Sequence, residues 1–397
     1  MALNPPRLLY LATADARGHL MRAQLLTHAL RAQGAHVDVL TTSAAGVQFL
    51  RRFGIDAALL SPHYAVQFDA RQNMRAAATD ANVAAYLLHP ARLLRDIVRL
   101  RRRLRGIDLV LNDSFHPALL VMGMLPGWRR RIVHVYGVSL RAALQGNFDG
   151  RLPRPAAALF ARLIGWQIDA AAAQLEHDFA QPRLHARGRR FRLPTPVALA
   201  AAAAPGAPPP APAAAVYLNP HFRDPALADA LEQGLQRAGL DSHRVGEGYP
   251  GRPGWVAEDP QWIASAAAST LLVSAPGMAA LSVAQVYRRP ILLVLTDQPE
   301  QQRNARRAAA CGLQHRTVVW HGDGDAFAQA VAAACRALQA EPPPPAPEPA
   351  ALDAPARLRL WVQLILALAR GQRAPIADAL VPAPAPAPVT VRQEQGA

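Results

Sequence analysis

The sequence lacks lysine altogether, so all 43 basic residues of the 397-residue chain are arginine. This absence excludes a P-loop lysine and a Schiff-base lysine. Cysteine is scarce as well: Cys311 and Cys335 are too few for a disulfide framework and are typical of a reducing cytosol. No apolar run reaches about 18 residues, and no signal-peptide pattern opens the chain. We therefore predict no transmembrane helix and expect a cytoplasmic protein.

Acidic residues are scarce in the N-terminal half. Residues 1–193 hold 27 arginines and 12 acidic residues, whereas residues 194–397 hold 16 of each, so the first half carries the whole net charge of +15. Aromatic residues are not interleaved with the arginines and base-reading motifs are absent, so we do not expect nucleic acid as a partner. No cluster of histidine, cysteine and carboxylate predicts a metal site, and we expect no cofactor.

Part of this positive charge lies on the segment Ala91–Gly106. Its apolar residues recur at helical spacing, arginines cover the rest, and Asp96 is the one opposing charge. Such a basic amphipathic helix could lie on an anionic membrane surface, which would place the protein on the inner face of the cytoplasmic membrane. It could equally be a solvated helix packed on a sheet, and the sequence leaves both readings open.

Two stretches rich in proline and alanine divide the chain. The first carries no charge and predicts an interdomain linker, and the second predicts a break before a last helix. We therefore expect an N-terminal domain, a linker, a C-terminal domain, a second linker, a helix that docks on a domain face and a disordered tail. Their predicted bounds are 1–193, 194–215, 216–340, 341–350, 351–372 and 373–397.

The beginning of the chain predicts a β-α-β unit. Strands are expected at Leu8–Thr13 and Val37–Thr41, with a helix at Leu20–Gln33 between them, but G-x-G-x-x-G is missing, which argues against a dinucleotide site. His19 lies in the turn between the first strand and the helix. A helix N-terminus disfavours a positive charge, so the ring is expected to stay neutral and to be available as a base. The alternative is a capping or surface histidine.

A carboxylate follows another predicted strand, Asp108–Asn112. If the sheet is parallel, Asp113 lies at the same edge as His19 and could orient the imidazole, as in any His–Asp pair. Asp113 could instead cap the following helix, because aspartate and serine are both favoured caps. The sequence does not choose between these roles.

The stretch Leu271–Gly312 predicts a second β-α-β unit. An apolar strand ends in a turn at Gly277, a helix follows to Tyr287, and a buried-type strand occupies Ile291–Leu295. The turn directs free backbone N–H groups above the sheet edge, where they suit a phosphate.

This stretch resembles the donor-nucleotide region of GT-B glycosyltransferases. In these enzymes a Gly-Gly turn opens a helix under the diphosphate, and a polar loop after the next strand reads the sugar. The predicted loop Gln298–Ala305 is similar to the E-Q-x-x-N-A signature of a branch related to MurG-type and UDP-glycosyltransferase enzymes. The Gly18–His19 pair also resembles the acceptor-activating histidine of this group. The resemblance implies an α/β protein of the GT-B fold, with two facing, doubly wound, Rossmann-like domains and an interdomain cleft.

The resemblance further implies an inverting, metal-independent transfer of a hexose-type sugar from a nucleotide-sugar, expected to be a UDP-sugar, to a hydroxyl of a lipid-linked or small hydrophobic acceptor. His19 would deprotonate that hydroxyl and Asp113 would support it. The donor would be contacted by backbone groups or side chains of Gly277, Met278, Ala279, Ser282, Asp297, Gln298, Glu300, Gln301 and Asn304. The acceptor would be contacted by Gly18, His63 and Tyr64.

Two positions depart from the family's pattern and keep other functions open. Pro276 replaces the first glycine of the turn, and Val283 stands where many relatives carry a ribose-binding glutamate. These departures favour a non-catalytic binding protein of the same fold as one alternative. A sugar-nucleotide epimerase, which can share the fold, is the other.

Overall fold

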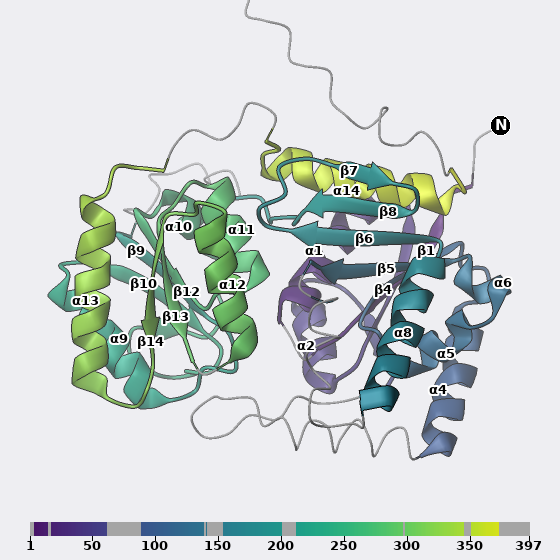
Figure 1. Cartoon of the computed structure of the whole chain (residues 1–397), viewed down its shortest axis with the longest axis horizontal. Coiled ribbons are helices and arrows are strands. Elements are labelled where there is room, and N and C mark those ends of the chain that lie inside the picture. The colour runs from purple at the N-terminus through teal and green to yellow at the C-terminus, as the bar shows by residue number, and fades with distance from the viewer. Residues whose placement is uncertain are drawn as a thin grey trace, which may run out of the picture.

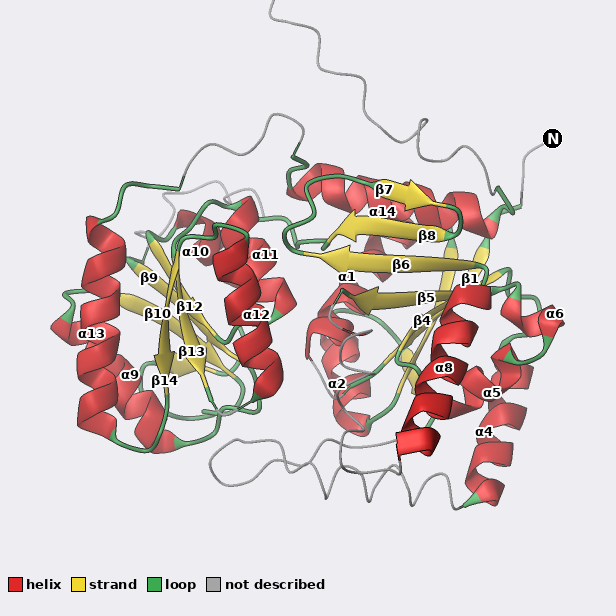
Figure 2. Cartoon of the chain, in the orientation of Figure 1, coloured by secondary structure: helices red, strands yellow, loops and turns green. Residues whose placement is uncertain are grey.

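Two parallel sheets, each covered by helices, form two α/β domains that lie side by side (Figures 1 and 2). The computed structural model describes residues 4–14, 17–61, 89–138, 140, 154–200, 212–296, 298–344 and 351–372.

The N-terminal sheet has the strand order β3-β2-β1-β4-β5-β6-β8-β7. All neighbouring strands are parallel except β7, which pairs antiparallel with β8. The order reverses between β1 and β4, the switch point at which doubly wound sheets place their sites. The strands are β1 Arg7–Ala12, β2 His36–Thr41, β3 Ala57–Leu59, β4 Leu109–Asp113, β5 Ile132–Gly137, β6 Ala173–Asp178, β7 His185–Arg187 and β8 Arg190–Pro194.

Helices cover both faces of this sheet. Alternate residues of β1 point to opposite faces, so Leu8 and Tyr10 pack with α1 and α2, whereas Leu9 and Leu11 pack toward α4 and α5. The helices of this half are α1 Arg17–Ala32, α2 Ala44–Arg52, α4 Pro90–Arg103, α5 Pro117–Gly123, α6 Pro126–Arg129 and α8 Arg154–Ala170. Near-continuous apolar strands follow from this burial on both faces.

The C-terminal sheet repeats the same winding, with the order β11-β10-β9-β12-β13-β14 and parallel pairs throughout. Helices α9 and α13 cover one face, and α10, α11 and α12 cover the other. The strands are β9 Ala214–Leu218, β10 Ser242–Gly246, β11 Trp255–Val256, β12 Leu271–Ser274, β13 Ile291–Leu295 and β14 His315–Val319. The helices are α9 Pro225–Arg237, α10 Trp262–Ala268, α11 Met278–Val286, α12 Pro299–Ala310 and α13 Gly324–Ala340.

The last helix, α14 (Ala354–Ala369), returns to the first domain and packs on α1 (Figure 1). The indole of Trp361 is fully buried in the N-terminal core and donates a hydrogen bond to the Pro194 carbonyl at 2.8 Å. The N-terminal core is therefore completed by residues from the far end of the chain.

One local prediction was wrong. The segment Gln298–Ala305, expected as a loop, is helical from Pro299 onward, with Gln298 as the N-cap of α12. Proline is favoured at the first helical position and Glu300 complements the helix dipole in the first turn. The signature residues therefore lie on the first two turns of a helix.

Candidate active site

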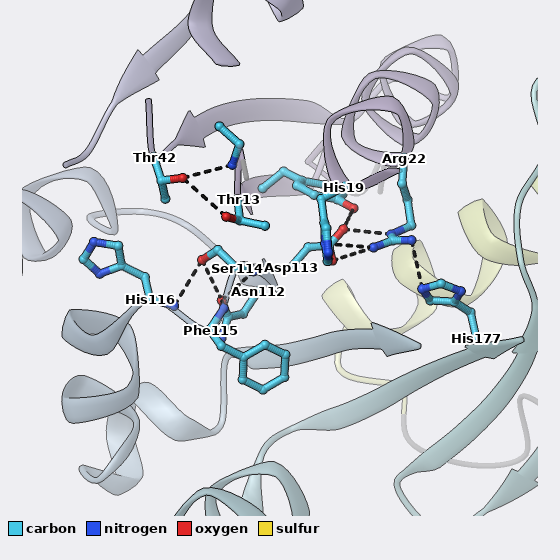
Figure 3. A network of polar contacts seen from close by, with 12 residues as sticks. Thr13, His19, Arg22, Thr42, Asn112, Asp113, Ser114, Phe115, His116 and His177 are labelled. Carbon is cyan, nitrogen blue, oxygen red and sulfur yellow. Dashed lines mark hydrogen bonds and ion pairs between the residues drawn. The ribbon is translucent and has the colours of Figure 1, made fainter. Parts of the chain in front are cut away.

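His19 and Asp113 meet at the carboxyl edge of the N-terminal sheet (Figure 3). The His19 Nδ1 lies 2.6 Å from the Asp113 Oδ1. The imidazole is 33% exposed, whereas the carboxylate is completely buried. The pair therefore joins a solvent-accessible ring to a buried anion.

The sheet register explains why two residues so far apart in sequence meet. Strands β1 and β4 are parallel neighbours, and Ala12, the last residue of β1, lies opposite Asp113, the last residue of β4. Helix α1 begins five residues after β1, which brings His19 in its first turn over the same edge. The predicted juxtaposition of the two side chains is thus present.

Asp113 is not the cap of the following helix, so that alternative was wrong. Helix α5 begins at Pro117, and its N-cap is His116, whose Nδ1 accepts the Ala118 N–H at 3.2 Å. The Asp113 carboxylate is consequently directed toward α1. His19 likewise belongs to the body of α1 and is not its cap.

Two further side chains bind Asp113, and neither was predicted from the sequence. Arg22 donates from Nε to Oδ2 at 2.8 Å and from Nη2 to Oδ1 at 2.7 Å, and the Tyr10 hydroxyl donates to Oδ2 at 2.8 Å. An arginine three residues after His19 on a helix with an apolar stripe was the available signal, because residues three apart share a face. Each carboxylate oxygen thus receives two donors.

This environment keeps Asp113 ionised. Burial by itself raises the pKa of the Asp113 carboxyl, but the charge of Arg22, followed by that of His19, holds it well below its ordinary value. Burial lowers the pKa of Arg22, and the neighbouring Asp113 more than offsets this effect, so the guanidinium stays charged. Burial and the Asp113 charge raise the pKa of Tyr10 well above its usual range, so its hydroxyl stays neutral.

A second histidine lies behind Arg22. The His177 Nε2 is 2.8 Å from the Arg22 Nη1, and its Nδ1 is 3.0 Å from the Thr195 hydroxyl (Figure 3). A guanidinium only donates, so Nε2 accepts and Nδ1–H donates. Burial, and then the Arg22 charge, lower the pKa of His177 well below its ordinary value, which keeps the ring neutral.

The turn after β4 holds Asp113 in place. The Asn112 side-chain oxygen accepts the Phe115 N–H at 3.1 Å and the Ser114 hydroxyl at 3.3 Å. Phe115 has a φ of 52°, a strained value for a bulky residue, and its ring stacks on His134 at 5.2 Å. Such strain persists only where neighbouring contacts fix the backbone, as Asn112 and His134 do here.

The predicted donor side opens at Gly277, the N-cap of α11. Its own N–H donates to the Ala275 carbonyl at 2.7 Å, and a contact of this N–H with the donor stays a prediction. The next N–H groups, those of Met278 and Ala279, lie in the first turn, which has no acceptors within the helix. They remain the predicted diphosphate contacts.

Three other predicted donor residues have side chains engaged within the protein. The Ser282 hydroxyl donates to the Met278 carbonyl at 2.7 Å, and the Gln301 Oε1 accepts the Thr296 N–H at 2.8 Å. The Asn304 amide donates to the Pro276 carbonyl at 2.8 Å, which ties α12 to the turn before α11. These contacts shape the turn, and donor contacts by the three side chains stay predictions.

The remaining predicted residues are placed as follows. Glu300 is exposed on the first turn of α12, and Gln298 precedes it. Gly18 lies in the first turn of α1, and no atom of the described residues stands within 4 Å of the position that a Cβ would take there. Asp297, His63 and Tyr64 lie outside the described residues.

Contacts between the domains bring the two sides together. The methyl group of Met278 and the ring of His177 both lie within 3.9 Å of the position that a Cβ on Gly137 would occupy. Arg17, in the same turn as His19, donates to Glu247 at 2.6 Å across the domains. The start of α11 therefore faces the same region as the His19 cluster.

Within the described part of the chain, no helix is long and apolar enough to cross a membrane. No group of histidine, cysteine and carboxylate side chains that could hold a metal ion occurs among the same residues.

No family model and no curated protein sequence matches the chain. Several solved structures, however, share its architecture. The calicheamicin glycosyltransferase CalG4 superposes with a TM-score of 0.56 at 16% identity, over 97% of this chain and 100% of that one. The spinosyn forosaminyltransferase SpnP gives 0.53 at 16% identity, over 94% and 97%. Arabidopsis thaliana UGT89C1 complexed with quercetin gives 0.54 at 14% identity, over 95% and 98%.

These matches span both domains, as the expected fold requires. The whole chain forms a two-domain architecture, which is defined by its strand orders, its facing domains and its returning C-terminal helix. The predicted fold class is confirmed: the chain has the GT-B fold, the two-domain α/β fold of glycosyltransferases.

Proposed function

We propose that the chain is a glycosyltransferase that moves a sugar from a nucleotide-sugar to a hydroxyl group of a hydrophobic acceptor. The observation that carries this proposal is the hydrogen bond of 2.6 Å between His19 and the buried Asp113. The fold supports it, since CalG4 and SpnP are named as a glycosyltransferase and a forosaminyltransferase.

The chemistry is a single displacement with inversion. The Nε2 of His19 removes the proton from the acceptor hydroxyl while its oxygen bonds to the anomeric carbon of the sugar. The bond from that carbon to the diphosphate oxygen breaks, and the nucleoside diphosphate leaves with the electron pair. The α11 N-terminus, through Met278 and Ala279, stabilises the negative charge that develops on the leaving group.

We propose a UDP-sugar carrying a hexose as the donor. This choice follows the likeness of the α12 residues to the E-Q-x-x-N-A signature, in which Glu300 and Gln301 match. The acceptor is proposed to be hydrophobic, either a small molecule or a lipid-linked hydroxyl. UGT89C1 was solved with quercetin, which favours the small acceptor.

The N-terminal domain carries a surface that favours a lipid-borne acceptor instead. Helix α5 contacts α4, α6 and α8, and several large apolar side chains on or next to these helices are exposed. Leu94 is 61% exposed and Trp166 is 45% exposed. The others are Val98, Val121, Met124, Leu125, Leu159 and Leu163. Exposed arginines of α4 border this apolar surface, so its charge suits an anionic membrane.

Vesicle binding tests this surface. We expect the protein to sediment with vesicles of phosphatidylcholine mixed with phosphatidylglycerol and to remain unbound with phosphatidylcholine alone. Leu94→Glu should abolish binding, whereas Val319→Glu, an equally apolar exposed position on the other domain, should not. Equal binding of both variants would mean that this surface does not contact the membrane, and no vesicle binding by wild type would argue for the small acceptor.

Donor binding and turnover test the proposed function itself. Purified protein is mixed with a panel of UDP-, TDP- and GDP-sugars, and thermal stability and nucleotide release are followed with and without hydrophobic acceptors. The proposal predicts a donor-specific rise in melting temperature and release that depends on the acceptor. Consumption of the donor without acceptor would indicate an epimerase, and binding without any turnover would indicate a non-catalytic binding protein.

A further inference from the structure

The unexpected member of the His19 cluster is Arg22. Its guanidinium is 8% exposed and uses all three nitrogens: Nε and Nη2 contact Asp113, and Nη1 contacts His177. Figure 3 shows Arg22 between the His19–Asp113 pair and His177. Glycosyl transfer by a His–Asp pair needs only the histidine and the carboxylate, so the buried arginine requires its own explanation.

The geometry around His19 Nδ1 provides that explanation. An ionised Asp113 only accepts, so the Nδ1 atom at 2.6 Å carries a proton and donates it. The Arg22 Nη2 lies 3.1 Å from the same Nδ1. Two donors face each other at this distance, so the contact is not a hydrogen bond. A second proton on the ring would add a positive charge directly beside the guanidinium.

We propose that Arg22 is a positioning residue that fixes the Asp113 carboxylate and keeps the His19 ring neutral, so that Nε2 is available to remove a proton from the acceptor. This inference rests on the proposed function. With a neutral ring, Asp113 and Arg22 balance each other's charge. A protonated ring leaves the cluster with one net positive charge.

The other groups that face the cluster do not change this balance. Tyr10 from β1 stays a neutral donor, and His177 from β6 stays a neutral acceptor. Among the residues that the structure describes, Asp113 from β4 and Arg22 from α1 are the charged groups that contact His19. Without the Arg22 charge, the Asp113 carboxylate therefore favours the protonated form of the His19 ring. An opposite charge this close shifts a titration to higher pH by about 1 to 3 units.

Two substitutions separate the charge of Arg22 from its geometry. Arg22→Gln removes the charge and keeps hydrogen-bond donors, whereas Arg22→Lys keeps the charge and loses the planar fork. In Arg22→Gln we expect the low-pH limb of kcat/KM to move up by about one unit or more, with a rate at neutral pH about tenfold lower. In Arg22→Lys the limb should stay in place, while kcat falls. Arg31→Met, on the same helix and bound to the Val37 carbonyl, is the matched control.

A second readout does not depend on turnover. Titration of the His19 ring by NMR should show that the ring keeps its proton to higher pH in Arg22→Gln than in wild type. If wild type is inactive with every donor, the proposed function fails, but this comparison still decides the role of Arg22. If Arg22→Gln does not fold, Asp113→Asn is compared with Asp113→Asn/Arg22→Gln, in which the ring should hold its proton to higher pH. Unmoved titrations in these comparisons, or equal rate losses in Arg22→Gln and Arg22→Lys at every pH, would overturn the proposal.

Discussion

Arg22 and Asp113 form a bidentate ion pair between residues 91 positions apart, with N–O distances of 2.7 and 2.8 Å. The pair joins α1 to the end of β4, the two elements that position the candidate base and its carboxylate. Both side chains are buried, so each depends on the other for charge balance.

This dependence predicts a strongly non-additive mutant cycle. Asp113→Asn should lower the free energy of unfolding by about 3 to 5 kcal/mol, because it leaves the buried Arg22 charge unpaired. Arg22→Met should lower it by less, because a protonated His19 ring partly offsets the charge that Asp113 loses. The double variant should lose much less than the sum of the two, since no unpaired charge remains. Urea denaturation of the four proteins measures the coupling. Additive losses would mean that the pair does not act as a unit.

Gly277 gives a prediction about the donor. Of the described residues, only the Ala275 carbonyl oxygen would lie near a Cβ at this position, at 4.0 Å, and the residue's φ is −81°, so a side chain fits. Gly277→Asp places a negative charge at the α11 N-terminus and should weaken the binding of a nucleotide-sugar by tenfold or more, in order of magnitude.

Gly277→Ala is the matched control, because it adds the Cβ without the charge. Isothermal titration should give affinities for Gly277→Ala within about threefold of wild type, well below the change expected for a charged contact. Equal weakening of nucleotide-sugar binding in both variants would mean that the added Cβ, and not the charge, disturbs binding. No weakening in either variant would place the donor elsewhere.

Buried neutral histidines predict a loss of stability in acid. Burial lowers the pKa of His116 to about 4 and that of His134 to about 4, from an ordinary value of 6.5. As the pH falls from 6.5 to 4 the unfolded chain takes up protons that the folded chain does not. Stability is therefore complete above pH 6.5 and is lost toward pH 4, by about 3 kcal/mol for each ring.

Chemical denaturation at a series of pH values checks this loss. His134→Phe removes one of the buried titrating histidines and should make the decline between pH 6.5 and 4 shallower. His28→Asn, at an exposed position on α1, should leave the slope unchanged. A slope that is the same in all three proteins would contradict the assignment.

The C-terminal helix should be necessary for the stability of the first domain. Trp361→Ala empties a fully buried site against α1 and removes the hydrogen bond to Pro194, at a cost of about 3 to 5 kcal/mol. Trp166→Ala, on the half-exposed face of α8, should cost less than about 1 kcal/mol. Urea denaturation compares the two, and equal losses would contradict the packing of α14 on this core.

Sequence reasoning reached the His19–Asp113 contact because the carboxyl ends of parallel strands meet at one edge. Arg22 was not predicted, because arginine on an amphipathic helix is usually a solvent-facing residue. Its burial depends on side-chain contacts with Asp113 of β4 and His177 of β6, which lie far from it in sequence.

The start of α12 was also misplaced, because it depends on contacts that the sequence does not show. Polar residues after a strand indicate a loop, whereas the proline at the first position of α12 favours the start of a helix. Nor could the sequence show that Gln301 and Asn304 bind Thr296 and Pro276, since these contacts depend on how α12 folds back on the turn.

Acceptor-dependent release of nucleoside diphosphate by wild type and by His19→Ala shows whether His19 is the base in glycosyl transfer. We expect release by wild type only when an acceptor is present, and a rate about 10² to 10⁴ lower in His19→Ala. The rise in melting temperature caused by the donor should be the same in both proteins. A His19→Ala variant that transfers the sugar at the wild-type rate would contradict the role of His19 as the base.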